Sequence, residues 1–163
     1  MSSATDRIEK RIVLRAPQER VWSAISDAKQ FGAWFGIAFD GAFVAGARLV
    51  GRIQPTSVDP EVARLQEPHK GKPATFVIER VEPMSLFSFR WHPFAIDPHV
   101  DYSGEPMTLV VFELRRESAG TLLTITESGF DGIPLARRTA AFQANEGGWS
   151  HQITNIEKYL AQA

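Results

Sequence analysis

The chain has 163 residues, a net charge of −1, 44% hydrophobic residues and no cysteine. This length and composition are typical of one domain with a full core, so we predict a single domain over residues 1–163. A charge this close to neutral offers no electrostatic footprint for nucleic acid or for an anionic membrane, and we expect neither as a partner. The absence of cysteine excludes disulfides, thiolate metal ligands and cysteine nucleophiles.

The start of the chain carries no sign of export. Residues 1–7 are polar and lack the apolar stretch of a signal peptide. No stretch approaches the ~20 apolar residues of a membrane span. Together with the lack of cysteine, which suits a reducing compartment, these features predict a cytoplasmic protein.

The first third of the chain predicts one strand and two short helices. Residues 8–16 alternate in side-chain character, which from Ile12 onward indicates a half-buried strand. Pro17 suits the first turn of a short helix, and a second short helix or turn is expected over 29–34.

The middle of the chain predicts a sheet. Regularly placed glycines favour two short strands near 37–39 and 47–54. Residues 55–73 contain four prolines and predict a long loop with room for a helical turn near 61–65. Four longer strands, rich in β-branched and aromatic residues, then follow at 74–81, 86–92, 107–116 and 121–128.

A long amphipathic helix is predicted from Leu135 to Leu160. The C-terminal half of its apolar stripe is expected to be purely apolar, whereas the N-terminal half interleaves Arg138, Asn145 and Glu146. Because desolvating such groups is costly, the pattern favours a helix that roofs a cavity over one that only plugs a core. The stripe itself consists of Leu135, Phe142, Trp149, Ile153, Ile156 and Leu160.

This order of elements predicts an α+β fold in which a meander sheet curls around the C-terminal helix. Alternation along the last strand allows either face to lie inside. The threonines of one face suit solvent, so we expect Leu123, Ile125 and Glu127 on the inner face, although Glu127 at the strand end has a half-solvated alternative. Gly147 and Gly148 each weaken the helix by roughly 1 kcal/mol relative to alanine, so they need either a close backbone neighbour or a bend.

Four segments carry a resemblance to a known family: RIVLRAPQERVWSAISD, VEPMSLFSFRWHPF, TLLTITESGFDGIP and NEGGWSHQITNIEKYL. They resemble the bacterial family similar to the activator of the ninety-kilodalton heat-shock protein ATPase. That family belongs to the START-like, helix-grip (SRPBCC) superfamily. The resemblance spans about residues 8–160 and implies a helix-grip fold. It also implies that a hydrophobic small molecule binds between the sheet and the long helix.

We therefore expect a cavity for a hydrophobic, aromatic or polyketide-like molecule, without a cofactor. Its polar end is predicted to comprise Glu127, Arg138, Asn145 and Glu146, with a salt bridge from Glu146 to Arg138 or Arg90 as the alternative. Simple core packing is the alternative for the apolar members. Those members are Trp34, Phe35, Phe39, Phe43, Phe76, Ile78, Phe89, Trp91, Phe112, Phe142 and Trp149.

Other functions stay open at this stage. Glu127 and Glu146 would suit the acid–base pair of a cofactor-free cyclase, dehydratase or isomerase. A co-chaperone or other interaction module, or a homodimer, is compatible with the outward apolar residues Val13, Leu109, Val111 and Leu122.

The proline-rich loop 93–106 is either a solvated loop or a lid with Phe94 and Tyr102 toward the ligand. His99 and Asp101 lack a third ligand at a suitable spacing, so we expect no metal site.

Overall fold

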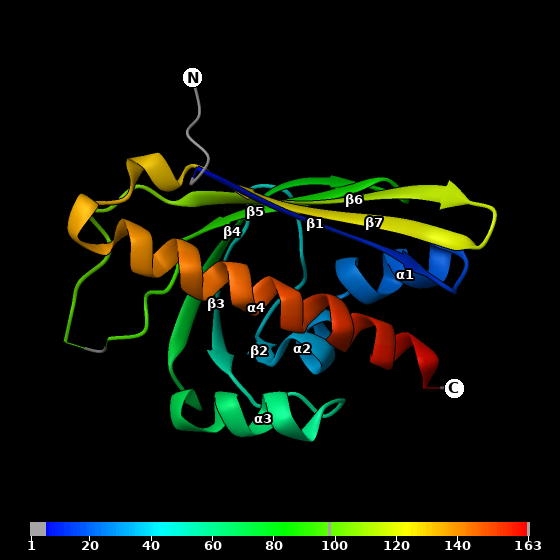
Figure 1. Cartoon of the computed structure of the whole chain (residues 1–163), viewed down its shortest axis with the longest axis horizontal. Helices are drawn as coiled ribbons and strands as arrows, with labels where there is room; N and C mark the ends of the chain where they lie inside the picture. Colours follow the sequence, from blue (N-terminus) through cyan, green and yellow to red (C-terminus); the bar gives the residue numbers. More distant parts are fainter. Residues whose placement is uncertain (1–5, 98, 163) are drawn as a thin grey trace.

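Across residues 6–97 and 99–162, which the computed structural model describes, seven strands form one antiparallel sheet (Figure 1). The strand order is β1-β7-β6-β5-β4-β3-β2, so β1 and β2 are its edges. The first strand begins at Arg7, earlier than the expected Ile12, and the other strands lie where the sequence predicts them apart from small shifts at their ends. The strands are β1 (Arg7–Leu14), β2 (Ile37–Phe39), β3 (Arg48–Ile53), β4 (Pro73–Glu82), β5 (Leu86–Trp91), β6 (Thr108–Glu117) and β7 (Gly120–Ser128).

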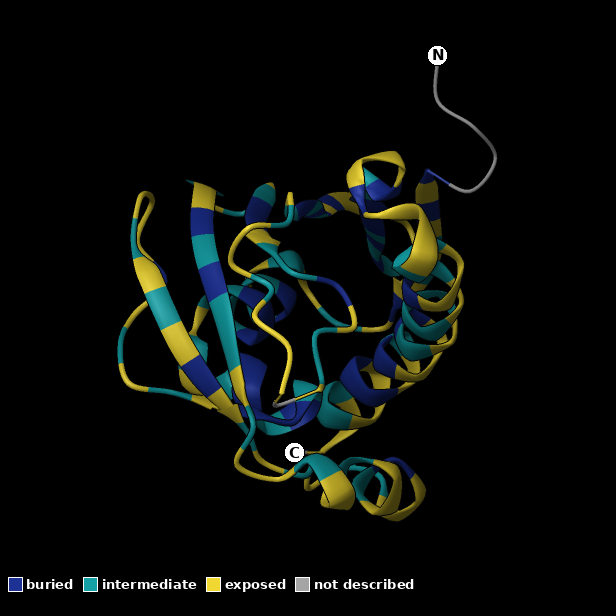
Figure 2. Cartoon of the chain, turned by 90° about the vertical axis from the view of Figure 1, so that its left-hand side faces the viewer, coloured by how far each residue is buried: buried dark blue, intermediate teal, exposed yellow. Residues whose placement is uncertain are grey.

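The helices pack against one face of this sheet. In Figure 1, α1 (Gln18–Ser26), α2 (Ala28–Phe35) and the long α4 (Leu135–Ala161) lie on the same side of the strands. The short α3 (Pro60–Gln66) lies at the far end of β3. Figure 2 shows that α4 turns its exposed residues away from the sheet. The predicted α+β arrangement is therefore confirmed.

Local sequence fixes the ends of the short helices. The Asp27 carboxylate caps α2 by accepting hydrogen bonds from the backbone N–H groups of Lys29 and Gln30, at 2.9 and 3.0 Å. Gly36, with φ of 97°, ends that helix in the left-handed conformation that glycine adopts without strain. An Asp59 cap followed by Pro60 starts α3. The predicted loop 55–73 thus contains a helix around the expected turn.

Burial confirms the inner face that alternation predicts for the long strands. Leu123, Ile125 and Glu127 of β7 are all buried, so the half-solvated alternative for Glu127 is wrong. The same alternation predicts inward residues on the neighbouring strands, and all of them are buried except Trp91, which is partly buried. The buried ones are Phe76, Ile78, Phe87, Phe89, Val110, Phe112 and Leu114.

Aromatic rings fill much of the space that the sequence assigns to a cavity. The rings of Phe76 and Phe89 stack with centroids 4.1 Å apart. From α2, the Phe31 ring reaches into the same cluster, 4.8 Å from Trp34 and 6.0 Å from Phe112. All five side chains are fully buried. Since such rings pack like a solid, this part of the interior is a core rather than a ligand chamber.

The helix α4 departs from its predicted stripe at two places. Leu135 is 77% exposed. It lies two heptads before Trp149, and a seven-residue spacing drifts around a straight helix by about 20° per heptad. The C-terminal half is not purely apolar, because Gln152 and Asn155 are buried there.

Candidate functional site

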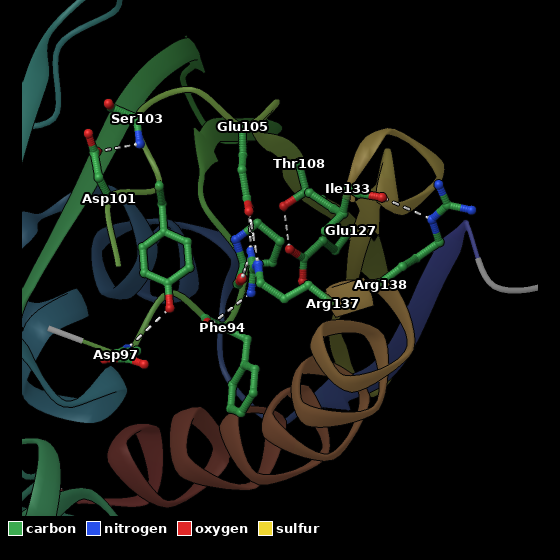
Figure 3. A network of polar contacts seen from close by, with 12 residues as sticks. Phe94, Asp97, Asp101, Ser103, Glu105, Thr108, Glu127, Ile133, Arg137 and Arg138 are labelled. Atoms are coloured by element: carbon green, nitrogen blue, oxygen red, sulfur yellow. Dashed lines mark hydrogen bonds and ion pairs between the residues drawn. The ribbon is translucent and has the colours of Figure 1, made fainter. Parts of the chain in front are cut away.

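Glu127 is fully buried and joins four elements through its carboxylate. Its Oε2 accepts hydrogen bonds from Trp91 Nε1 at 2.7 Å and from Thr108 Oγ1 at 2.6 Å. Its Oε1 accepts one from Trp149 Nε1 at 2.8 Å. The Asn145 amide lies 2.8 Å from Oε1 and 3.1 Å from Oε2. Figure 3 shows Thr108 and Glu127 pointing toward each other. The carboxylate thus ties β5, β6 and β7 to α4.

This carboxylate has donors around it but no basic partner. Among the residues that the structure describes, none of the ion pairs includes Glu127. Burying a charged group costs free energy, which hydrogen bonds to charged acceptors partly offset. Each carboxylate oxygen accepts two hydrogen bonds of 2.6 to 2.8 Å, and these bonds occupy its lone pairs. Glu127 is therefore a positioning residue that orients two indole rings.

A hollow of about 80 Å³ lies beside this network. The rings of Phe35, Trp91 and Trp149 form its aromatic side, with centroids 5.8 to 6.0 Å apart. Asn145, Gly148 and Gln152 of α4 complete the lining. Six lining residues from three elements thus place aromatic surface and amide groups around one small space.

Side-chain amides hold the α2 wall of the hollow in place. Gln152 Nε2 donates to the backbone oxygen of Phe35 at 2.8 Å, and Gln66 Nε2 donates to the same oxygen at 3.0 Å. Asn155 Nδ2 donates to the Trp34 backbone oxygen at 3.1 Å. The last carbonyls of a helix have no partner within the helix, so these bonds satisfy them and fix the position of Phe35.

The paired glycines of α4 border the hollow. Among the described residues, no atom outside the helix backbone and its neighbours lies within 4 Å of a Cβ placed at Gly147 or Gly148. A close backbone neighbour is thus not the reason for either glycine. Gly148 lines the hollow, whereas Gly147 is exposed. A side chain at 148 would enter the space that the glycine leaves free.

The predicted polar end of the cavity is assembled only in part. Glu127 and Asn145 meet as expected, but Glu146 forms an ion pair with Lys10 of β1 and is half exposed. The alternative partners Arg138 and Arg90 for Glu146 are also wrong. Arg138 points away from Glu127 in Figure 3 and donates to the backbone oxygens of Asp131 and Ile133.

The apolar residues predicted to bind a ligand separate into several groups. Phe35, Trp91 and Trp149 line the small hollow. Phe39 and Phe43 line a different, open groove of about 740 Å³ between α2, β2 and the segment 54–57. Phe142 instead packs edge-on against Phe130, with centroids 5.2 Å apart. The remaining residues belong to the packed core: Trp34, Phe76, Ile78, Phe89 and Phe112.

The loop 93–106 is fastened to the first turn of α4 by Arg137. Its guanidinium donates to the Glu105 carboxylate at 2.7 Å and to the backbone oxygens of Pro93 and Phe94 at 3.0 and 3.1 Å (Figure 3). It also lies 4.8 Å from the centroid of the Tyr102 ring. Both ends of the loop therefore depend on one side chain. Within the described part of the chain, no group of three His, Asp or Glu side chains is placed to hold a metal ion.

Several residues of the site were not predicted from the sequence. Thr108 lies opposite Trp91 in the sheet, and its place one alternation before Val110 marks it as inward. Gln152 follows Trp149 by one helical turn, which is the signal for a shared face. For Arg137 no comparable signal exists, because its partners lie in an irregular loop.

The curved antiparallel sheet with one long C-terminal helix across its face is the helix-grip fold of START-like (SRPBCC) proteins, as the resemblance implied. Within this class, the family described as Activator of Hsp90 ATPase homolog 1-like protein matches residues 15–161, and the chain belongs to this family. No curated protein matches the sequence. Among the described residues, no helix is long and apolar enough to cross a membrane.

Solved structures share the fold at low sequence identity. DynU16, from the dynemicin biosynthetic locus, is 20% identical with a TM-score of 0.67; the match covers 96% of this chain but 48% of DynU16, about half its length. A protein from Nitrosomonas europaea is 19% identical with a TM-score of 0.70, covering 99% and 98% of the two chains. The Aha1 dimer from Colwellia psychrerythraea is 17% identical with a TM-score of 0.67, covering 96% of each.

Proposed function

We propose that this protein binds a small, largely hydrophobic molecule, aromatic or polyketide-like, at the hollow beside Glu127. The observation that carries this proposal is the combination of a fully buried carboxylate with two indole rings that it orients around an unfilled space. A buried charge without a basic partner reduces the stability that an apolar core would give. A residue that reduces stability in this way is expected at a position where ligand binding, and not packing alone, explains the residue type.

The size of the hollow limits how a ligand binds. Ligand pockets commonly measure ~300–1,000 Å³, so about 80 Å³ accommodates one end of a ligand. The loop 93–106 begins two residues after Trp91, which lines the hollow. The remainder of a larger ligand would extend out of the hollow. DynU16, which belongs to a biosynthetic locus, supports a small molecule as the partner.

Catalysis by Glu127 and Glu146 has less support. Glu127 has used its acceptor capacity on protein donors, and Glu146 pairs with Lys10 instead of facing the hollow. An acid–base pair needs both groups within hydrogen-bond reach of one substrate. Binding is therefore the function that this geometry supports best.

Neutral aromatic probes test the proposal directly. Calorimetric titration and thermal shift with p-cresol and 2-naphthol are expected to show binding to the wild-type chain. Gly148→Leu fills the hollow and is expected to weaken binding by about tenfold or more, the equivalent of ~1.4 kcal/mol. The matched control Gly147→Leu changes the same residue type one position away, on the exposed side, and is expected to bind like the wild type. Equal affinities in the two variants would place binding elsewhere.

We also propose that the chain forms a homodimer. The Aha1 protein from Colwellia psychrerythraea is described as a dimer, and the apolar Val13 on edge strand β1 is exposed beside Leu122 of β7. Light scattering after size exclusion tests this. A monomer mass at all concentrations, or an unchanged dimer in Val13→Lys, would contradict a dimer formed by this surface.

A further inference from the structure

We propose that the hollow recognises the cationic ammonium head group of a small organic amine. This inference rests on the proposed binding function and specifies the chemical class of the ligand. It follows from the charge of Glu127, from the aromatic lining, and from the way the polar groups of the lining are already used.

The charge around the hollow has one sign. Glu127 lies behind the indole rings with no basic partner among the described residues. The cations that link α4 to neighbouring segments through ion pairs are each paired with another carboxylate: Lys10 with Glu146, Arg137 with Glu105, and Lys158 with Asp59. The residues that line the hollow include no Lys, Arg or His. A ligand in this space is therefore close to a carboxylate that has hydrogen-bond donors around it but no basic partner among the described residues.

The aromatic lining adds to this preference. Phe35, Trp91 and Trp149 lie within 6.0 Å of one another and present three rings on one side of the hollow. A ring face attracts a cation placed within about 6 Å of its centroid, and tryptophan is the strongest of the three types. Both indole N–H groups donate to a carboxylate, which polarises each ring toward higher electron density.

The amide donors of the polar lining residues are partly used by the protein itself. The Asn145 amide nitrogen makes two contacts with Glu127, and the Gln152 amide nitrogen donates to the Phe35 backbone oxygen. Their amide oxygens keep acceptor capacity, because a carbonyl oxygen has two lone pairs. An ammonium group supplies the donors that such oxygens need, whereas a carboxylate supplies none.

Three probes that share one ring separate charge from size. Benzylamine is a cation at pH 7, benzyl alcohol is neutral and benzoate is an anion. Titrations measured by tryptophan fluorescence and by calorimetry are expected to rank benzylamine first, about tenfold tighter than benzyl alcohol, the equivalent of ~1.4 kcal/mol, because aromatic ring faces attract a cation. Benzoate is expected to bind most weakly. Glu127→Gln keeps the shape of the side chain and is expected to remove most of the preference for the amine.

The outcomes distinguish this inference from the proposed function. Binding of benzoate or benzyl alcohol as tightly as benzylamine overturns the amine and leaves small-molecule binding intact. Failure of all three probes overturns both. A preference that persists unchanged in Glu127→Gln overturns Glu127 as its source. Should that variant not fold, Gly148→Leu and Gly147→Leu decide, since the amine must lose affinity only in the former.

Discussion

Trp149 and Glu127 connect the long helix to the last strand of the sheet through one buried hydrogen bond, 2.8 Å from Nε1 to Oε1. Trp91 approaches the other oxygen of the same carboxylate from β5, at 2.7 Å. The two indole centroids are 5.8 Å apart. One acidic side chain thus determines the relative position of two large rings that come from opposite walls of the interior.

Replacing Glu127 with glutamine should destabilise the protein. The new amide group brings hydrogens into a cluster that consists of donors, so at least one buried donor loses its acceptor. Such a loss costs ~1–3 kcal/mol, and urea unfolding measures it. Glu113→Gln is the control because Glu113 is exposed on β6, and surface changes usually stay within ±0.5 kcal/mol. Equal effects of the two substitutions would contradict the role of the network.

Asn155→Ala is expected to loosen the end of α2. The variant removes the donor that satisfies the Trp34 backbone oxygen, and a buried unpaired carbonyl costs ~1–3 kcal/mol. Thermal unfolding should show a lower Tm, together with faster hydrogen exchange at the C-terminal end of α2. Glu157→Ala, exposed on the same helix, serves as the control. An unchanged Tm in Asn155→Ala would show that the amide bond has little net effect.

Arg137→Ala should release the loop 93–106. The variant removes the pairing with Glu105 and the bonds to the backbone oxygens of Pro93 and Phe94, while α4 itself keeps its hydrogen bonds. Limited proteolysis is expected to cleave this loop faster than in the wild type. Arg138→Ala is the adjacent control, because Arg138 contacts the segment 131–133 and not the loop. Similar cleavage in both variants would contradict the assignment.

The stability of the protein should fall as the pH drops below about 6.5. Burial lowers the pKa of His92 below its ordinary value, with Glu105 opposing the shift and Arg137 adding to it. The unfolded chain therefore takes up a proton at a higher pH than the native state does. Above pH 6.5 this histidine does not reduce the free energy of unfolding. As the pH falls from 6.5 toward the lowered pKa, protonation favours the unfolded state and the free energy of unfolding decreases.

Urea unfolding between pH 7.5 and 5 measures this dependence. His92→Gln removes the titrating group and should flatten the slope. Burial also lowers the pKa of His69, with Lys72 adding to the shift, so part of the slope should persist until both histidines are replaced. A slope unaffected by either substitution would contradict the assignment.

The fold and the inner faces of the strands were predictable because a strand alternates with a period of two and burial follows that period. Glu127 was placed correctly for this reason, and Asn145 was placed correctly because it falls on the inward face at the 3.6-residue period of a helix. Arg138 and Glu146 were placed wrongly, because a long charged side chain on a helix flank reaches whatever partner lies beside it. The extent of the hollow also escaped prediction, since periodicity tells which rings point inward but not how closely they pack.

The hydrogen bonds of Glu127 have a consequence for how this sequence can change over time. Each of the four side chains that donate to it would lose its acceptor if the acid disappeared, and the acid would be left buried and uncompensated if the donors disappeared. Positions 91, 108, 127, 145 and 149 should therefore be inherited as a set. Relatives without an acid at 127 are expected to lack the two tryptophans as well and to hold their helix by apolar contacts instead.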